Sequence, residues 1–378
     1  MDILKETKLI GNYIISLRKD FHKYPELSME EHRTSRRIKE ELDKIGVKYE
    51  NGIKTEVVAT IGKGEGRVIA LRADMDALRI QENTDVRYAS ANKGVMHACG
   101  HDFHTSAILG AAILINENKA KLHGKVRIIF QPAEEIAKGA KIIIESGAID
   151  NVEVIFGMHN KPDLPVGTIG IKEGPLMASV DRFEIDIIGV GGHAGIPEET
   201  IDPIVIGSEL VMGLQTIVSR ALSPFNNAVI SVTKFQSGNT WNVIPEKATI
   251  EGTVRTFQEE ARKRIPTLMK RKVEGIAKAS GAKIDFRWIP YSPVLYNDKD
   301  YKALVTDVAL ELGYEVVEAK EIAAGEDFAL YQNKIPGFFV WMGVDGEKDW
   351  HHPSYDLNED ALIVAAKYFS NLVFKVLS

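Results

Sequence analysis

The strongest constraint on the fold is a change in residue patterning near residue 178. Beyond it, residues 183–187 alternate apolar and polar side chains, which is typical of a strand with one exposed face. A Gly-rich turn follows, and then helices and strands in the order β-α-β-β-α-β, which is the ferredoxin-like motif. These elements are expected at residues 183–187, 202–221, 228–236, 248–257, 259–279 and 283–289. We therefore predict an α+β domain over residues 179–292.

The flanking sequence has a different pattern. Apolar residues recur at helical spacing through the first fifty positions, and β-rich runs then alternate with helical stretches. The β-rich runs are Val57–Ile61, Val68–Leu71 and Val126–Phe130, and Ala107–Leu114 suits a helix buried against a sheet. The alternation resumes at Tyr301–Leu312. We predict one mixed-sheet α/β domain, made from residues 1–178 and 293–378, with the α+β domain inserted into it.

Composition excludes several classes of function. The net charge of -6 and the lack of a clustered Lys/Arg stripe argue against nucleic-acid binding. We find no run of the roughly 18 apolar residues that a membrane span needs. Residues 1–6 carry both charge signs, so no signal peptide is expected. The single cysteine, Cys99, cannot form an intrachain disulfide, which fits a reducing cytoplasm.

The densest chemical signal is the stretch from His97 to His104. It holds His97, Cys99, His101, Asp102 and His104. A thiolate and an imidazole two residues apart, across a glycine that frees the backbone, can point at one metal site. The alternative is a buried cysteine beside helix-capping polar residues.

Further candidate ligands each follow a β-like run. Glu134 and Glu135 follow the run that ends at Phe130, His159 ends the run that starts at Ile155, and His351 and His352 lie near the C-terminus. Adjacent side chains cannot both point the same way, so one glutamate can bind metal while the other faces water. Taken singly, the glutamates could instead open a helix and each histidine could be structural. Their repetition after strands favours ligands gathered from several strand ends, as in catalytic metal sites.

These motifs make the chain resemble the dinuclear metallopeptidase family of aminoacylases and carboxypeptidase G. The resemblance is to its branch of bacterial N-acyl-L-amino acid amidohydrolases, which also contains plant auxin-conjugate hydrolases. It covers nearly the whole chain. The motifs are residues 72–78 (RADMDAL), 99–102 (CGHD), 132–135 (PAEE), 157–159 (GMH), 191–194 (GGHA), 242–245 (NVIP), 252–255 (GTVR) and 325–328 (GEDF).

The resemblance implies a set of metal ligands and a base. The ligands are Cys99, His101, Glu135, His159 and His351, where His351 is favoured over His352 by aligning Tyr355 and Asn358-Glu359 with the closing motif of the family. They would hold two divalent ions, zinc or manganese, with cobalt or nickel as alternatives. Glu134 would be the general base and then the acid. Asp76 would orient a ligand imidazole.

This chain departs from the wider family at two positions and from the branch at one. Asp74 stands where the wider family has a ligand histidine, and Cys99 stands where it has a bridging aspartate. The amidohydrolase branch shares both changes, with His101 supplying the missing imidazole. Arg79 replaces a proline that is usual in the branch, and we expect only a local effect on the loop.

We expect the inserted domain to be a lid and dimerisation domain, and because its sheet should offer an exposed edge or helix face for pairing, we expect a homodimer. Its His193, Asn242 and Arg255 are candidates for binding substrate, with the guanidinium suited to a free carboxylate. The alternatives are a turn histidine, a turn residue before proline and a cross-strand ion pair, respectively. The expected activity is hydrolysis of N-acyl, chiefly N-acetyl, L-amino acids. A metallo-carboxypeptidase or dipeptidase on the same site, or an inactive metal-binding scaffold, remain as alternatives.

Overall fold

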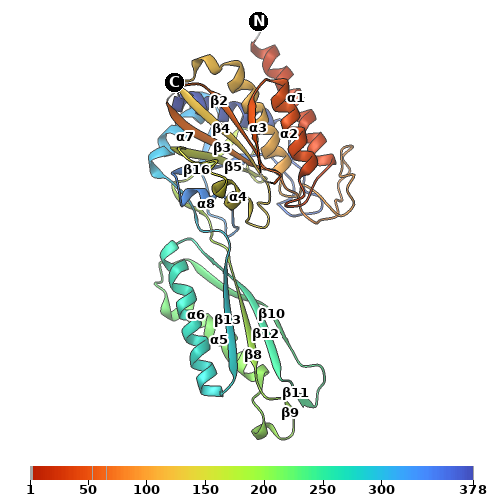
Figure 1. Ribbon diagram of the computed structural model, residues 1–378, viewed down its shortest axis with the longest axis vertical. Helices are drawn as coiled ribbons and strands as arrows, with labels where there is room; N and C mark the ends of the chain where they lie inside the picture. The colour runs from red at the N-terminus through yellow and green to blue at the C-terminus, as the bar shows by residue number, and fades with distance from the viewer. Residues whose placement is uncertain (1–2, 53, 65, 378) are drawn as a thin grey trace. The chain divides into compact units, whose positions relative to one another are not determined.

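The computed structural model describes residues 3–52, 54–64 and 66–377. They form two compact units (Figure 1). The first contains the described residues of Met1–Gly174, Tyr296–Lys320 and Asp327–Ser378, and the second contains Pro175–Leu295 and Glu321–Glu326. The boundaries drawn from sequence, after residues 178 and 292, lie a few residues inside the second unit, and that division stays a prediction. No sequence pattern indicated that Glu321–Glu326 belongs with the second unit.

An eight-stranded mixed sheet forms the centre of the first unit, with the order β1-β2-β4-β3-β5-β16-β6-β15. Pairing is parallel for β3–β4, β3–β5, β5–β16 and β6–β15 and antiparallel for β1–β2, β2–β4 and β6–β16. The strands are β1 (Lys48–Asn51), β2 (Val57–Gly62), β3 (Arg67–Asp74), β4 (Gly124–Gln131), β5 (Val154–Lys161), β6 (Thr168–Ile171), β15 (Glu315–Glu318) and β16 (Gly337–Gly343).

The central strands are buried on both faces. Strand β16 has no exposed residue and β5 has only its last residue partly exposed. Such continuous burial is typical of parallel strands covered on both sides. Since β3, β4 and β5 run parallel, their carboxyl ends lie at one edge of the sheet, where open α/β sheets bind ligands.

Helices surround this sheet. Helix α3 (His101–Glu117) is buried along most of its length and packs against α1, α9 and β3. It contains the predicted buried stretch Ala107–Leu114. The other helices of this unit are α1 (Ile3–Lys23), α2 (His32–Lys44), α4 (Gly139–Glu145), α7 (Lys302–Glu311), α8 (Ala329–Gln332) and α9 (Ala361–Leu377), with short 3-10 turns η1 (Lys119–Lys121) and η4 (Lys299–Tyr301).

The second unit is a four-stranded antiparallel sheet with the order β10-β12-β8-β13. Helices α5 and α6 pack against each other and against this sheet (Figure 1). Along β8, buried residues alternate with partly exposed ones, as predicted. The elements are β8 (Asp181–Ile188), α5 (Pro203–Thr216), β10 (Ala228–Ser237), β12 (Lys247–Thr256), α6 (Glu259–Ser280) and β13 (Lys283–Pro290).

Short elements complete the second unit. Strands β9 (Gly192–His193) and β11 (Val243–Ile244) pair with each other, η2 (Pro197–Glu199) is a 3-10 turn, and η3 (Ile217–Ala221) continues α5 as a π-helical turn. The chain passes between the units in β7 (Gly174–Met177) and β14 (Leu295–Asn297), and again at each end of Glu321–Glu326. The predicted fold class, a mixed-sheet α/β domain with an inserted ferredoxin-like α+β domain, is confirmed.

One helix among the described residues is apolar enough to need comment, although the sequence holds no unbroken run of 18 apolar residues. The helical segment Pro203–Ala221 is long and apolar enough to cross a membrane. Its inner face, which includes Ile206, Leu210 and Leu214, belongs to the core of the second unit. A core helix of a soluble protein passes the same test, so this segment is only weak support for a span.

Candidate metal centre

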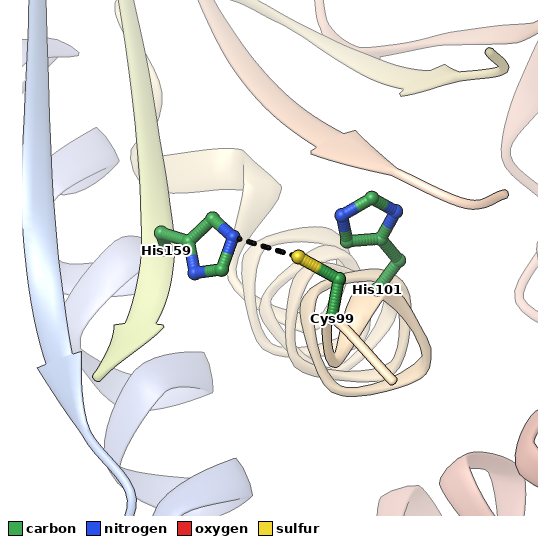
Figure 2. Close-up of side chains that lie close together, drawn as sticks. All are labelled: Cys99, His101 and His159. Atoms are coloured by element: carbon green, nitrogen blue, oxygen red, sulfur yellow. Dashed lines mark hydrogen bonds between the residues drawn. The ribbon is translucent and has the colours of Figure 1, made fainter. Parts of the chain in front are cut away.

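The candidate ligands come from segments that meet at the carboxyl edge of the first unit's sheet. Glu134 and Glu135 follow β4, His159 lies near the end of β5, and Cys99 and His101 lie where α3 begins. Figure 2 shows His159 and His101 on either side of the Cys99 sulfur, which lies 3.4 Å from His159 Nε2. The sheet topology therefore brings together residues that are far apart in sequence.

Three overlapping groups of side chains place their ligand atoms within 4.8 Å of one another. They are Cys99–His101–His159, Cys99–Glu135–His351 and His101–Glu134–Glu135. All of the predicted ligands are present, and the Cys99 sulfur belongs to two of the groups. His351 Nε2 lies 3.7 Å from Glu135 Oε1, whereas His352 joins no such group among the described residues.

Hydrogen bonds orient the two buried imidazoles. His159 Nδ1 lies 2.9 Å from the carbonyl oxygen of Asn160, so it donates there and leaves Nε2 facing Cys99. His101 Nδ1 lies 2.9 Å from the carbonyl oxygen of Asp76. Its Nε2 is buried and has no hydrogen-bond partner among the described residues, and the same holds for Glu135 Oε1. Because buried polar atoms are nearly always satisfied, these two atoms fit a bound cation.

The electrostatics of the cluster also fit a cation. Burial raises the pKa of the Cys99 thiol well above its ordinary value, and the Glu135 carboxylate raises it further. Burial raises the pKa of Glu135 to about 7. Burial lowers the pKa of His159 well below its ordinary value, which keeps the imidazole neutral as a ligand must be. A divalent cation would stabilise the thiolate and the carboxylate that burial disfavours.

Asp76 bonds to both the imidazole and the glutamates. Its carboxylate accepts the backbone N–H of Glu134 and that of Glu135, both at 3.1 Å, and lies 3.2 Å from His101 Nδ1. Ser28 Oγ donates to it at 2.7 Å. Burial opposes its charge, but the hydrogen bond with His101 lowers the pKa of Asp76 below its ordinary value overall. The sequence suggested only the imidazole contact.

Glu134 and Glu135 are adjacent but bond differently. Glu134 Oε1 accepts the backbone N–H of Asp327 at 3.3 Å, whereas Glu135 Oε1 lies 3.9 Å from His101 Nε2. Ala133, which precedes them, has a positive φ of 53°, an uncommon conformation for a residue with a Cβ. Such strain persists where surrounding structure holds it, often at functional sites.

Asp74, His101 and His104 form a further group of possible ligands. His104 Nδ1 lies 2.6 Å from Asp74 Oδ1, and His104 Nε2 accepts the backbone N–H of Asn160 at 2.9 Å. Both ring nitrogens of His104 are therefore used inside the protein. These bonds hold His104 between Asp74 and Asn160, beside the candidate ligands.

Asn160 was not singled out by sequence reasoning, although it follows His159. Its Nδ2 donates to the carbonyl oxygen of Cys99 at 2.7 Å. Its Oδ1 accepts from Tyr355 Oη at 2.6 Å and from Trp350 Nε1 at 3.0 Å. The rings of Trp350 and His159 lie 4.4 Å apart. One buried amide thus joins the segments that carry Cys99, His159 and His351.

The substrate-binding candidates lie in the second unit. His193 on β9 is exposed, and its Nδ1 accepts the backbone N–H of Gly195 at 3.0 Å. Asn242 is next to it, since its carbonyl accepts the N–H of Ala194 at 3.2 Å. Both residues therefore make contacts within a turn, as expected if they are only turn residues. Their roles in binding substrate stay predictions.

Arg255 lies apart from these two, on β12. Its Nη1 atom is buried and has no hydrogen-bond partner in the part of the chain that is described. Burial lowers the pKa of Arg255, and the charge of Asp181 opposes this only partly. No ion pair of Arg255 is present among the described residues, so the cross-strand ion pair has no support, and a role in binding an anion stays a prediction.

A thiolate, imidazole and carboxylate cluster at the carboxyl edge of a mixed-sheet α/β unit is typical of a catalytic metal site. The chain belongs to peptidase family M20/M25/M40, whose model matches residues 70–375. It is 54% identical over 373 residues to the N-acetylcysteine deacetylase of Bacillus subtilis (strain 168), covering 98% of each chain. It is 37% identical to thermostable carboxypeptidase 1 of Saccharolobus solfataricus, covering 99% of each.

Solved structures agree with this assignment. The YXEP protein of Bacillus subtilis, described as a dinuclear metal-binding peptidase of the M20 family, superposes with a TM-score of 0.89 at 50% identity, covering 98% of this chain and 99% of that one. A putative aminohydrolase from methicillin-resistant Staphylococcus aureus gives a TM-score of 0.95 at 34% identity, covering 100% and 99%. The predicted family and the prediction of a metal-dependent hydrolase are confirmed.

Proposed function

We propose that this enzyme hydrolyses the amide bond of small N-acyl L-amino acids, N-acetyl derivatives first among them, with Glu134 as its base. The observation that carries the proposal is the pair of adjacent glutamates with different surroundings. Glu135 directs a buried, unpartnered oxygen into the ligand cluster, while Glu134 is held beside it by the N–H of Asp327. The likeness to the N-acetylcysteine deacetylase supports the class of substrate.

In this proposal Cys99, His101, Glu135, His159 and His351 hold two divalent ions, zinc or manganese, with cobalt or nickel as alternatives. When bound, two such ions supply Lewis-acid activation of water and of the substrate carbonyl. The Glu134 carboxylate removes a proton from the attacking water and then delivers it to the leaving amine nitrogen. Asp76 keeps the His101 imidazole and the backbone of both glutamates in place.

The glutamates provide the sharpest test. Glu134→Gln keeps the shape of the side chain but cannot transfer a proton, so it should retain metal and lose about 10²–10⁴-fold in turnover. Glu135→Gln replaces an anionic ligand with a neutral one, so it should lose metal and be partly rescued by excess metal. Elemental analysis and turnover at several metal concentrations measure both. Metal loss in Glu134→Gln with a fully loaded Glu135→Gln would reverse the roles.

A second candidate is a carboxypeptidase or dipeptidase activity on the same site, which the likeness to thermostable carboxypeptidase 1 favours. The two differ in the acyl group that the site accepts. A screen of N-acetyl amino acids against dipeptides, run in parallel with zinc, manganese, cobalt and nickel, separates them. Preference for dipeptides by the ratio of kcat/KM would replace the first proposal.

We also infer a homodimer in which the second unit takes part. Supporting this, Val205 and Met212 of α5 are 64% and 70% exposed, a large apolar exposure for one helix.

We also propose that His193, Asn242 and Arg255 bind substrate, with the arginine binding its free carboxylate. Mixing inactive His193→Ala with inactive Glu134→Ala tests whether His193 acts on the partner's site. No recovery despite proven subunit exchange would assign it to its own subunit. The lone Cys99 supports a cytoplasmic location.

A further inference from the structure

The turn that carries Glu134 is held through three consecutive backbone amides. Ala133 N–H donates to Glu31 Oε1 at 2.9 Å, and the N–H groups of Glu134 and Glu135 donate to Asp76 at 3.1 Å each. Glu31 comes from the segment before α2, and 102 residues separate it from Ala133. The bond therefore fixes the strained peptide that directly precedes Glu134.

The Glu31 carboxylate is buried, and hydrogen-bond donors hold it in place. It is fully buried, and Thr55 Oγ1 and the backbone N–H of Met29 are its other donors, at 2.7 and 2.9 Å. No cationic side chain pairs with it among the described residues. Burial raises the pKa of Glu31, and the nearby Asp76 carboxylate raises it further. Since a buried carboxylate is costly without donors, these hydrogen bonds determine where it can lie.

Helix capping does not explain why a glutamate is buried at position 31. It stands at the N-terminal end of α2, yet its side chain makes no capping hydrogen bond. Glu26 does that instead, because its carboxylate accepts the backbone N–H groups of Arg33 and Thr34 at 2.9 and 2.7 Å. The two glutamates thus have separate tasks, and only Glu31 reaches the Ala133 turn.

We propose that Glu31 is a positioning residue for the base Glu134. Its hydrogen bond to the Ala133 amide fixes the direction in which the Glu134 carboxylate leaves the turn. Asp76 continues to hold Glu135, so the metal ligands need not move when Glu31 is lost. The inference rests on the proposed function, in which Glu134 is the base.

The test compares Glu31→Ala with the matched control Glu26→Ala. Loss of the Ala133 contact should lower kcat about 10- to 100-fold, because a misplacement of about 1 Å has that effect on catalysis. KM and metal content should stay within about twofold of the wild type, as expected when only transition-state stabilisation is lost. Glu26→Ala should lower thermal stability and leave kcat unchanged. Glu31→Gln should recover most of the rate, because its amide oxygen can still accept from Ala133 and its NH₂ can donate to Thr55.

Amide hydrogen exchange in metal-free protein gives a readout independent of activity. The peptide containing residues 133–135 should exchange faster in Glu31→Ala than in Glu26→Ala or the wild type. Unchanged kcat and unchanged exchange in Glu31→Ala would overturn the proposal, and so would an equal loss of kcat in Glu26→Ala. If Glu31→Ala does not fold, Glu31→Asp, which is one methylene too short for the contact, replaces it. Full activity of Glu134→Gln would instead refute the proposed function itself.

Discussion

Replacing Asn160 by alanine removes the side chain that joins the candidate ligand segments. Its Nδ2 donates to the Cys99 carbonyl at 2.7 Å, and its Oδ1 accepts from Tyr355 Oη at 2.6 Å. The Trp350 indole also donates to Oδ1, at 3.0 Å, but it keeps a bond to the Asn160 backbone carbonyl at 3.2 Å. Nδ2 also lies 3.0 Å from His104 Nε2, which keeps the Asn160 backbone N–H at 2.9 Å. Two buried groups, the Cys99 carbonyl and the Tyr355 hydroxyl, therefore keep no bond to residue 160 in Asn160→Ala.

The expected magnitude follows from those two groups. A buried group that loses its partner costs about 1–3 kcal/mol, so Asn160→Ala should lower the free energy of unfolding by roughly 2–6 kcal/mol. This is a large share of a total of about 5–15 kcal/mol. The segments of Cys99, His159 and His351 also become less well held, and changes in such supporting contacts lower metal affinity about 10- to 100-fold.

Asn297→Ala is the matched control. Asn297 is equally buried, and it bonds to the carbonyl oxygens of Lys172 and Phe339 and to the N–H of Phe339, none of which belongs to the metal centre. Both variants should lose stability in calorimetry of the metal-free protein. Only Asn160→Ala should lose metal affinity in titrations against a competing chelator. Equal metal affinity in the two variants would refute the idea that Asn160 organises the site.

Three other outcomes are expected. Gly100→Ala should lower the free energy of unfolding by about 2–5 kcal/mol, because φ is +80° and a Cβ would lie 2.4 Å from Asn160 Nδ2. Elemental analysis should also show that this variant has lost metal. Exhaustive chelation should abolish turnover while the circular dichroism spectrum is retained, since a large core holds the fold without metal; full turnover of metal-free protein would contradict this. Burial opposes the charge of His22, but its hydrogen bonds to Asp102 and Glu82 raise its pKa above 6.5 overall. The stability that this provides is present below pH 6.5 and lost as pH rises through the raised pKa, so urea midpoints should fall with rising pH in the wild type and less so in His22→Gln.

Sequence patterns predicted the fold because they are local. The alternation in residues 183–187 and the buried run Ala107–Leu114 each reflect one element and the face that it buries. Which strands become neighbours has no comparable local signal. The antiparallel pairing of β16 with β6, inside a sheet that is otherwise parallel around β5, depends on packing over the whole unit.

The same distinction applies to the candidate site. Motif residues such as Cys99, His101 and Glu135 could be selected from sequence, and the structure places them in one cluster, although their roles as ligands stay predictions. Asn160 and Glu31 carry no motif of their own. Their importance comes from hydrogen bonds to residues 61 and 102 positions away, which a reading along the chain cannot detect.

The two sides of the candidate centre are held differently. Two buried carboxylates from separate segments hold the glutamate-bearing turn, since Glu31 accepts from Ala133 and Asp76 accepts from Glu134 and Glu135. A third buried carboxylate, Asp327, accepts from Ala140 at 3.0 Å, near the start of α4. His351, by contrast, has a positive φ of 63° and an exposed side chain, although its backbone N–H bonds to Ala98 at 2.8 Å. The protein alone therefore sets the position of the proposed base, whereas the His351 side chain depends more on the ion that it would bind. Because the base is in place beforehand, metal loading need not reorganise Glu134, and the binding energy of the ion can go into recruiting the last ligand.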